Sequence, residues 1–252
     1  MGQRGKANNL LAGVNACVEA MKEGREIERL FIKKGTRSET LSEMMSMARE
    51  RGIPISYVPI EKLDRLTRVN HQGVVGVASL IEYGILEDLI PFLYEQGKDP
   101  LILVLDRVTD VRNFGAICRT AECMGVDAVV IPDKEAAQVN VEAMKTSAGA
   151  LNRIPVCRVQ DLKKSIRFLQ NSGLKVVAAS EKGSEAVYKT DLIGPLTVVM
   201  GSEEDGVSDA LIRTADLLLS IPMPGKTDSL NVSVAAGMFL YEVARQRGLS
   251  TK

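Results

Sequence analysis

The chain of 252 residues has no tryptophan, one histidine and four cysteines, and this scarcity limits the chemistry open to it. The cysteines form no CxxC pair, because they stand apart as Cys17, Cys118, Cys123 and Cys157. With His71 as the one histidine, they do not give the ligand spacing of a zinc site. We therefore expect no metal centre, and free thiols that suit a reducing compartment.

Long apolar runs are also missing. No run approaches the ~18 apolar residues of a membrane-spanning helix, and the first residues show no signal-peptide core. We therefore expect a cytoplasmic protein that makes no contact with a membrane. The absence of GxGxxG, GxxxxGK[ST], HExxH and GxSxG argues against a dinucleotide dehydrogenase, a P-loop NTPase, a zinc protease and an α/β-hydrolase.

Charge of neither sign is in excess, since the formal net charge is +0, but the charges are unevenly distributed. Residues 1–80 hold 13 Lys/Arg and 9 Asp/Glu, and residues 81–252 hold 19 and 23. A basic first part predicts contact with a polyanion, and an uneven but solvated surface is the alternative explanation. The polar loop around His71 either faces a substrate or has a structural role.

The order of apolar and polar segments divides the chain into three regions. Residues 1–80 are expected to form a small α/β domain, residues 81–99 a connector with a short helix at residues 86–95, and residues 100–252 a larger domain. In the small domain, Asn8 or Asn9 is expected to cap a first helix that carries Leu11, and Ser38 is expected to cap a second helix. In the larger domain, apolar strands alternate with helices of about a dozen residues, which predicts an α/β fold with a largely parallel sheet and helices on both faces. The expected strands are 101–106, 127–132, 154–159, 174–180, 196–201 and 216–222.

Three loops at strand ends are candidates for a binding site, because ligands in open α/β sheets lie outside the carboxyl ends of the strands. In the first loop, Asn113 is expected to begin a helix, and Arg119 lies off the apolar face of that helix. Arg107 and Arg112 add positive charge where a phosphate could bind. The alternative is a helix cap followed by solvated arginines.

The second loop, residues 200–206, has three consecutive acids between two glycines, which let a backbone pass close to a ligand. The acids Glu203, Glu204 and Asp205 either stabilise the start of the next helix or attract a cationic ligand such as a sulfonium or ammonium. Because carboxylates repel phosphates, we do not expect a triphosphate site.

The third loop, residues 221–231, is stiffened by two prolines. Its apolar residues Ile221, Met223 and Leu230 suit the face of a purine. Ser229 and Asn231 supply short polar groups at the start of the last helix, where helix capping is the alternative explanation.

These loops resemble three motifs of the SpoU (TrmH) family of RNA ribose 2′-O-methyltransferases in the SPOUT superfamily. The matching segments are NFGAICRTAE, VVMGSEEDGV and IPMPGKTDSLNVSVAAG, within residues 100–247. In addition, GVNACVEAM and NHQGVVGVA resemble the substrate-binding domain that precedes many members. That arrangement is typical of the branch that methylates a guanosine ribose in large-subunit ribosomal RNA. The chain departs from the family in its low net positive charge and in the acidic pair Glu204 and Asp205.

The resemblance implies S-adenosylmethionine as cofactor, a C-terminal trefoil knot, and a homodimer formed through the catalytic domain with the active site near the subunit interface. It implies catalytic roles for Asn113, Arg119, Glu203, Ser229 and Asn231. It implies cofactor contacts for Gly201, Ile221 and Leu230, with neighbours Met200, Met223 and Ser180. We expect RNA contacts from Arg4, Lys6, Arg112 and His71.

The implied reaction is a direct methyl transfer to a ribose 2′-hydroxyl, which has to lose its proton during the attack. The family's arginine, here Arg119, is proposed as the general base. Because a guanidinium has a pKa above ~12, stabilising the developing alkoxide and holding the phosphate is an equally physical role. A transfer-RNA substrate and a non-catalytic RNA-binding or ribosome-assembly protein are the alternatives to ribosomal RNA methylation.

Overall fold

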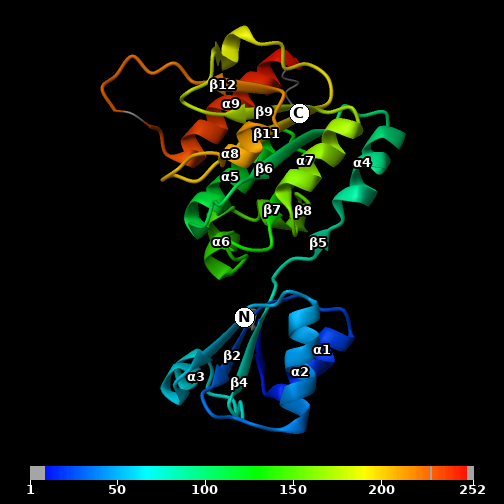
Figure 1. The fold of residues 1–252 in the computed structure, drawn as a ribbon, viewed down its shortest axis with the longest axis vertical. Coiled ribbons are helices and arrows are strands. Elements are labelled where there is room, and N and C mark those ends of the chain that lie inside the picture. Colours follow the sequence, from blue (N-terminus) through cyan, green and yellow to red (C-terminus); the bar gives the residue numbers. More distant parts are fainter. Residues whose placement is uncertain (1–8, 228, 249–252) are drawn as a thin grey trace, which may run out of the picture. The chain divides into compact units, whose positions relative to one another are not determined.

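The computed structural model describes residues 9–227 and 229–248, which fold into two compact units separated after Glu82 (Figure 1). We call them unit 1 and unit 2. The boundary falls at the amino-terminal end of the expected connector. Two of the predicted RNA contacts, Arg4 and Lys6, lie outside the described residues.

Unit 1 is a four-stranded sheet with helices on both faces. The strand order is β1-β4-β2-β3, in which β2 and β3 are parallel and the other pairs antiparallel. One face packs on α1 and α2 through Cys17, Met21 and Met44, and the other packs on α3 through Leu63. The elements are β1 (Leu10–Ala12), α1 (Val14–Lys22), β2 (Ile27–Lys33), α2 (Glu39–Glu50), β3 (Ile55–Val58), α3 (Ile60–Leu66) and β4 (Val74–Ala78).

Unit 2 is an eight-stranded sheet, and every strand pair found among its described residues is parallel. The prediction of a largely parallel sheet is therefore confirmed. The strand order is β10-β12-β9-β11-β6-β7-β8-β5. The strands are β5 (Tyr83–Gly84), β6 (Leu101–Leu105), β7 (Ala128–Pro132), β8 (Val156–Val159), β9 (Lys175–Ala179), β10 (Glu185–Ala186), β11 (Leu196–Met200) and β12 (Leu217–Ser220).

Helices cover both faces of this sheet (Figure 1). α4, α7 and α8 share one core with the strands, and α9 and α6 pack against α5 on the other face. Both faces are covered, so the central strands β6 and β11 are buried along their whole length, as their continuous apolar sequences indicate. The helices are α4 (Leu86–Glu95), α5 (Val111–Cys123), α6 (Val141–Thr146), α7 (Leu162–Asn171), α8 (Asp209–Ile212) and α9 (Val232–Gln246), with short 3-10 turns η1 (Ala150–Asn152) and η2 (Val187–Lys189).

Most of the expected connector, residues 81–99, belongs to unit 2. Its short helix is present as α4, with the expected bounds. However, α4 buries Leu86, Ile90 and Leu93 in the same core as α7, and β5 pairs with β8. The apolar stripe of α4 therefore makes the segment part of the larger fold rather than a linker.

The strand order brings distant loops together at one edge of the unit 2 sheet. β11 lies between β9 and β6, although β7 and β8 separate β6 from β9 in the chain. The carboxyl ends of β9, β11, β6 and β12 therefore meet at the same edge, where a ligand site is expected. Among the described residues, no helix is long and apolar enough to span a bilayer.

Candidate active site

A hydrogen-bonded cluster links the three predicted loops. The Asn113 side-chain amide donates to Oε1 of Glu203. The Asn231 amide donates to Oδ1 of Asn113 at 3.2 Å and lies 3.5 Å from Oε1 of Glu203. The structure therefore brings together three of the five predicted catalytic residues, one from each loop.

Asn113 is available for this cluster because another residue caps its helix. α5 begins at Val111, two residues before the predicted start, and Asp110 is its cap. The Asp110 carboxylate accepts from the backbone N–H groups of Arg112 and Asn113, both at 2.8 Å. The prediction that Asn113 begins the helix was wrong, because Asp110 satisfies the first free donors.

Asn231 has two tasks at the start of α9. It is the cap of the helix, and its side-chain oxygen accepts from the backbone N–H of Ser233 at 2.9 Å. Its amide nitrogen is then directed to Asn113. Capping thus fixes the orientation of the Asn231 side chain. Asn231 is therefore both the cap of the helix and a polar group of the site.

The acidic second loop is held in shape by hydrogen bonds within its own backbone. The backbones of Ser202 and Gly206 exchange two hydrogen bonds, of 3.1 and 3.0 Å. A side-chain carbon on Gly201 would come within 1.9 Å of the Gly206 backbone. Gly201 is therefore required because the loop packs against its own backbone, in addition to any ligand that it approaches.

Arg107 and Asp106 hold the ends of this loop. Nη1 of Arg107 contacts Asp205 at 3.0 Å, and Nη2 donates to the Gly206 carbonyl at 3.1 Å. The buried Asp106 accepts from the backbone N–H of Ser208 at 2.7 Å. The suggestion that Arg107 offers charge to a phosphate is not supported, because its guanidinium is already committed to the loop.

A pocket of about 410 Å³ opens beside this cluster. It lies at the carboxyl ends of β9, β11 and β12, and Phe239 of α9 contributes to its lining. This volume is within the range of small-molecule sites. The lining includes Glu203 and Ser229 and all six predicted cofactor residues: Ser180, Met200, Gly201, Ile221, Met223 and Leu230.

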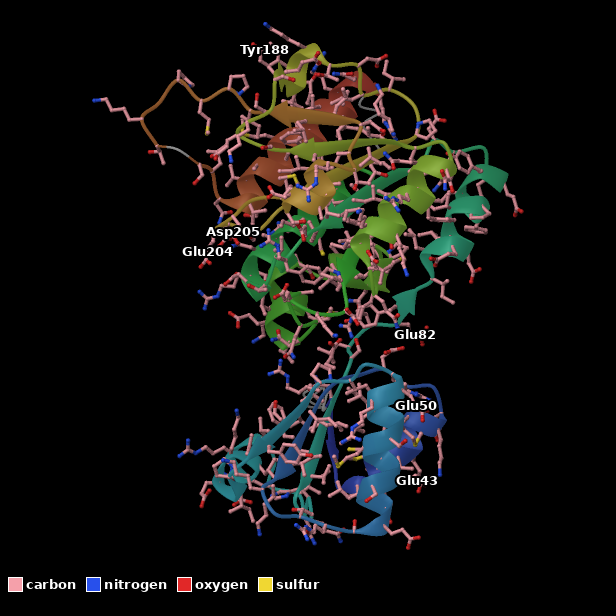
Figure 2. The ribbon with its side chains drawn as sticks, in the orientation of Figure 1. Glu43, Glu50, Glu82, Tyr188, Glu204 and Asp205 are labelled. Atoms are coloured by element: carbon pink, nitrogen blue, oxygen red, sulfur yellow. The ribbon has the colours of Figure 1, made fainter. Side chains whose placement is uncertain are left out.

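The lining of the pocket is acidic on one side and apolar on another. Figure 2 shows Glu204 and Asp205 together on the second loop. Five acids line the pocket with one base, Lys182. Such a lining fits a cofactor that joins an aromatic ring system to a cationic sulfur and amine, as predicted for S-adenosylmethionine. The five acids are Glu181, Glu203, Glu204, Asp205 and Asp209.

Arg119 is outside this pocket in its own chain. Its side chain is exposed on α5, and within residues 9–227 and 229–248 it has no hydrogen bond or ion pair. Ser229 lines the pocket but is exposed, and Asn231 rather than Ser229 caps α9. The structure therefore leaves the predicted arginine unengaged.

The other predicted RNA contacts have partners within the chain. Arg112 forms an exposed ion pair of 2.6 Å with Glu142, which raises the pKa of the arginine through a hydrogen bond and charge. His71 is buried, with Nε2 at 3.0 Å from Asp64 and Nδ1 accepting from the backbone N–H of Gly73 at 3.1 Å. Both ring nitrogens of His71 are occupied, which favours its structural role.

The described residues indicate neither a metal site nor, at three of the four cysteines, a reactive thiol. No group of three or more His, Cys, Asp or Glu side chains is placed there to hold a metal ion. Burial raises the pKa of Cys17 and of Cys157 to about 11, and it raises the pKa of Cys118 as well. These three thiols are therefore poor nucleophiles at neutral pH.

Several residues of the site were missed by the sequence reasoning. Glu181 and Lys182 directly follow β9, as Ser180 does, so the strand-end rule alone could have found them. Asp106 carries no local signal beyond a polar residue after a strand, and its role depends on the second loop, which the fold brings to it. Asp110 acts within its own segment, as the cap of α5, and it was missed because the helix was expected to begin at Asn113.

Two family models match the chain. The SpoU rRNA Methylase family matches residues 100–241, and a model for RNA 2′-O ribose methyltransferase substrate binding matches residues 10–84. Among curated relatives, the putative TrmH family tRNA/rRNA methyltransferase YacO of Bacillus subtilis is 36% identical, covering 95% of this chain and 96% of its own. The 23S rRNA (guanosine-2′-O-)-methyltransferase RlmB of Xylella fastidiosa is 36% identical, covering 97% and 99%.

Solved structures show the same similarity. The AdoMet-bound rRNA methyltransferase from Sinorhizobium meliloti has a TM-score of 0.62 and 27% identity, covering 96% of this chain and 88% of its own. The SpoU methyltransferase AviRb from Streptomyces viridochromogenes, in complex with the cofactor AdoMet, has a TM-score of 0.60 and 25% identity, covering 97% and 94%. With both family models and relatives matched over nearly the whole length, this chain belongs to the SpoU family of RNA methyltransferases.

Proposed function

We propose that this protein transfers a methyl group from S-adenosylmethionine to the 2′-oxygen of a guanosine ribose in large-subunit ribosomal RNA. The observation that carries the proposal is the Asn113–Glu203–Asn231 cluster beside an acidic and apolar pocket. The relative from Xylella fastidiosa, similar over nearly its full length, is named for this reaction. Two of the similar solved structures are described as bound to AdoMet.

The pocket residues have separate binding roles in this proposal. S-adenosylmethionine, when bound, supplies an electrophilic methyl group on a sulfonium. Ile221, Met223 and Leu230 contact its purine, because they are the apolar side chains of the third loop in the lining. The acids of the second loop attract the cationic end. Ser180, Met200 and Gly201 complete the wall at the strand ends.

The polar cluster positions the ribose. The Asn113 amide and the Asn231 amide both point to Glu203, and this fixes the orientation of the carboxylate. A carboxylate held in one orientation accepts a hydrogen bond from a ribose hydroxyl in a defined geometry, and such positioning supplies much of the rate of a direct transfer. Ser229, exposed at the pocket rim, adds a hydroxyl contact.

Arg119 acts on the developing negative charge. An exposed guanidinium favours stabilising the alkoxide and gripping the adjacent phosphate over removing a proton. Since Arg119 is not in the pocket of its own chain, we propose that it serves the pocket of a second copy.

A homodimer through unit 2 supplies that second copy. α9 exposes an apolar stripe of Val234, Met238 and Tyr241, which are 51%, 45% and 53% accessible. These positions lie on one helical face. The stripe is close to Arg119, because the neighbouring Thr120 approaches Gly237 of α9. A second copy that covers the stripe would bury its apolar surface and bring Arg119 to the interface.

We also propose that the C-terminal segment is knotted, with α9 threaded through the loop between β9 and β11. Contacts of α9 with this loop and with α5 support the topology. The Gln246 amide donates to the Thr190 carbonyl at 2.9 Å and accepts from Leu192 N–H at 2.8 Å, and α9 also packs on α5. Knots are rare in proteins, so the topology is a specific claim.

Unit 1 delivers the RNA in this account. The model of RNA 2′-O ribose methyltransferase substrate binding covers residues 10–84, which is the described part of unit 1 and its junction. The excess of basic over acidic residues in residues 1–80 also suits RNA.

An in vitro assay tests the function. The purified protein is incubated with methyl-labelled S-adenosylmethionine and, separately, ribosomal RNA or transfer RNA from a strain lacking this gene. Label in the 2′-O-methylguanosine of ribosomal RNA supports the proposal. Label in transfer RNA alone favours the second candidate, suggested by the tRNA/rRNA name of the Bacillus subtilis relative. No label in either RNA favours a non-catalytic role.

A further inference from the structure

Unit 1 has an open cleft of about 720 Å³ that the proposed reaction does not use. Two chain segments form it. One is the end of β2 with the turn that follows, including Lys33 and Thr36, and the other is residues 60–73, from α3 to the start of β4.

Hydrogen bonds hold together the two segments that form this cleft. Lys33 N–H donates to the Gly73 carbonyl at 2.8 Å, so the two segments are joined. Gly73 has φ +85, and a side-chain carbon there would come within 3.0 Å of Thr36 Oγ1. The buried His71 holds Asp64 on one side and Gly73 N–H on the other. His71 is thus a positioning residue for the cleft.

A strained residue lies at the rim. Gln72 has φ +47, a left-handed conformation that favours glycine, and its N–H donates to Asn70 Oδ1 at 3.3 Å. Such strain persists where the surroundings enforce it, and it is common at ligand contacts. Here it places two carboxamide side chains, those of Asn70 and Gln72, in the lining.

Basic side chains dominate the two segments. Residues 33–37 and 60–73 contain six basic and two acidic residues, so they account for a net charge of +4. Lys33 and Arg68 line the cleft and form no ion pair within the described residues. The acid in the lining, Asp64, is bonded to His71. Figure 2 shows Glu43 and Glu50 on α2, which packs on the other face of the sheet from α3.

Apolar side chains are exposed among these polar groups. Ile60 is 39% and Val69 is 58% accessible, and both line the cleft. A surface that combines free cations, carboxamides and an apolar wall matches the three parts of a nucleotide: phosphate, base edge and base face. A base inside an A-form duplex does not present its face or its pairing edge, so this surface requires an unpaired base.

We propose that this cleft binds one unpaired nucleotide of the RNA substrate. Lys33 and Arg68 contact its phosphates, Ile60 and Val69 contact the base face, and the carboxamides of Asn70 and Gln72 contact the base edge. The identity of the natural RNA rests on the proposed function. The cleft makes unit 1 a reader of single-stranded RNA and gives it a defined contact for the substrate.

Fluorescence anisotropy of the full-length protein tests the cleft. The probes are a labelled single-stranded RNA of about 12 nucleotides and a duplex of the same sequence. Lys33→Glu with Arg68→Glu should weaken single-strand binding at least tenfold. Lys33→Ala and Arg68→Ala should each reduce the salt dependence, log K against log salt, by about 0.7. Val69→Asp should reduce the preference for single strand over duplex.

Arg49→Glu with Arg51→Glu is the matched control, because it makes the same charge change as the double variant, in unit 1, at the far end of α2, roughly 18 Å along the helix from the turn at Ser38. Cofactor affinity, measured by calorimetry, should be unchanged in every variant and reports the folding of unit 2, and thermal unfolding followed by circular dichroism reports the folding of unit 1. The proposal is overturned if the double variant of Lys33 and Arg68 binds like the double variant of Arg49 and Arg51, or if the unsubstituted protein does not bind the single strand.

The two proposals fail in different ways. Binding of the oligonucleotide and its salt dependence need no methyl transfer. If the protein methylates no RNA but the cleft variants lose the oligonucleotide, the proposed function fails and the cleft stands. If it methylates ribosomal RNA and the double variant leaves KM unchanged, the cleft proposal fails alone. The expected result is a KM raised at least tenfold with kcat unchanged.

Discussion

Asn113 and Glu203 are 90 residues apart in the sequence, and the Asn113 side chain donates a hydrogen bond to the Glu203 carboxylate. The bond joins the first turn of α5 to the acidic loop after β11. It forms because β6 and β11 are neighbours in the sheet. Asn231, from the start of α9, completes the cluster. The site therefore depends on the strand order as much as on the residues of any one loop.

Replacing Glu203 tests whether this cluster contributes to catalysis. We expect Glu203→Gln to lower kcat at least tenfold, about 1.4 kcal/mol of transition-state stabilisation. Both asparagines lie on the same oxygen of Glu203, Oε1, and the change replaces the other oxygen, the one left to accept from a ribose hydroxyl, by an NH2 donor. S-adenosylmethionine affinity should stay within about threefold, since the rest of the lining is intact. Single-turnover methylation measures the rate of methyl transfer, and calorimetry measures the affinity for S-adenosylmethionine. The matched control is Glu204→Gln on the same loop, and equal activity in the two variants would exclude the role.

Mixing inactive variants tests where Arg119 acts. Arg119→Ala should lose methyl transfer but bind S-adenosylmethionine normally, because Arg119 does not line its own pocket. If it serves the partner, mixed dimers of Arg119→Ala and Leu230→Asp contain one complete site. Random exchange then restores about a quarter of wild-type activity. Mixtures that stay inactive, although mass spectrometry detects the mixed dimers, would place Arg119 in its own subunit's site.

Leu230→Asp tests the position of the cofactor. Leu230 lines the pocket and is 37% accessible, so the change adds a charge without removing a core side chain. We expect S-adenosylmethionine to bind at least tenfold more weakly, about 1.4 kcal/mol, because an apolar contact is lost. Ile85→Asp is the control, as an exposed apolar residue outside the pocket lining. Unchanged calorimetric affinity of Leu230→Asp would show that the pocket is misassigned.

Two truncations test the boundary between the units. Removal of residues 1–82 should leave a folded protein that binds S-adenosylmethionine, because the core of unit 2 is complete without unit 1. Removal of residues 1–99 also deletes α4, whose Leu86, Ile90 and Leu93 are buried against α7. Loss of each such side chain costs about 2 kcal/mol. Thermal unfolding should show a much lower Tm for the longer truncation, and equal Tm values would mean that α4 is dispensable.

The lowered pKa of Glu242 predicts how the stability of the fold depends on pH. Hydrogen bonds from Arg245 and Gln246 lower the pKa of this carboxyl from 4.5 to about 2. A lowered pKa stabilises the fold above the unfolded-state value, and the contribution is lost as pH falls from 4.5 towards 2. Glu242→Gln should cost on the order of 1 kcal/mol at neutral pH, since Arg245 is half-exposed. The Tm difference from wild type should shrink over this acid range, and a constant difference would contradict the assignment.

Local sequence patterns predicted much of the fold but few of its interactions. The expected helix at residues 86–95 is confirmed as α4, and the expected cap by Ser38 is confirmed at the start of α2. Residues 10–12 were expected in the first helix but form β1, because β4 offers them an edge to pair with. Such pairing is set by distant residues, which local periodicity does not report.

The site shows the same division between local and distant information. The polar residues of the three loops were identified from strand ends and from the family resemblance. The cap at Asp110 was not, although it is a local interaction with the backbone of Arg112 and Asn113. The commitment of Arg107 to Asp205 was also missed, because the two residues are 98 positions apart. Charge counts along the chain do not show which charges are already paired.

Mapping ribose methylation across cellular RNA tests the central claim most directly. A strain that lacks this gene should lose 2′-O-methylation at one guanosine of large-subunit ribosomal RNA. The wild-type gene should restore it, and Glu203→Gln should not. Unchanged ribosomal RNA methylation in the deletion strain, or a loss confined to transfer RNA, would contradict the account.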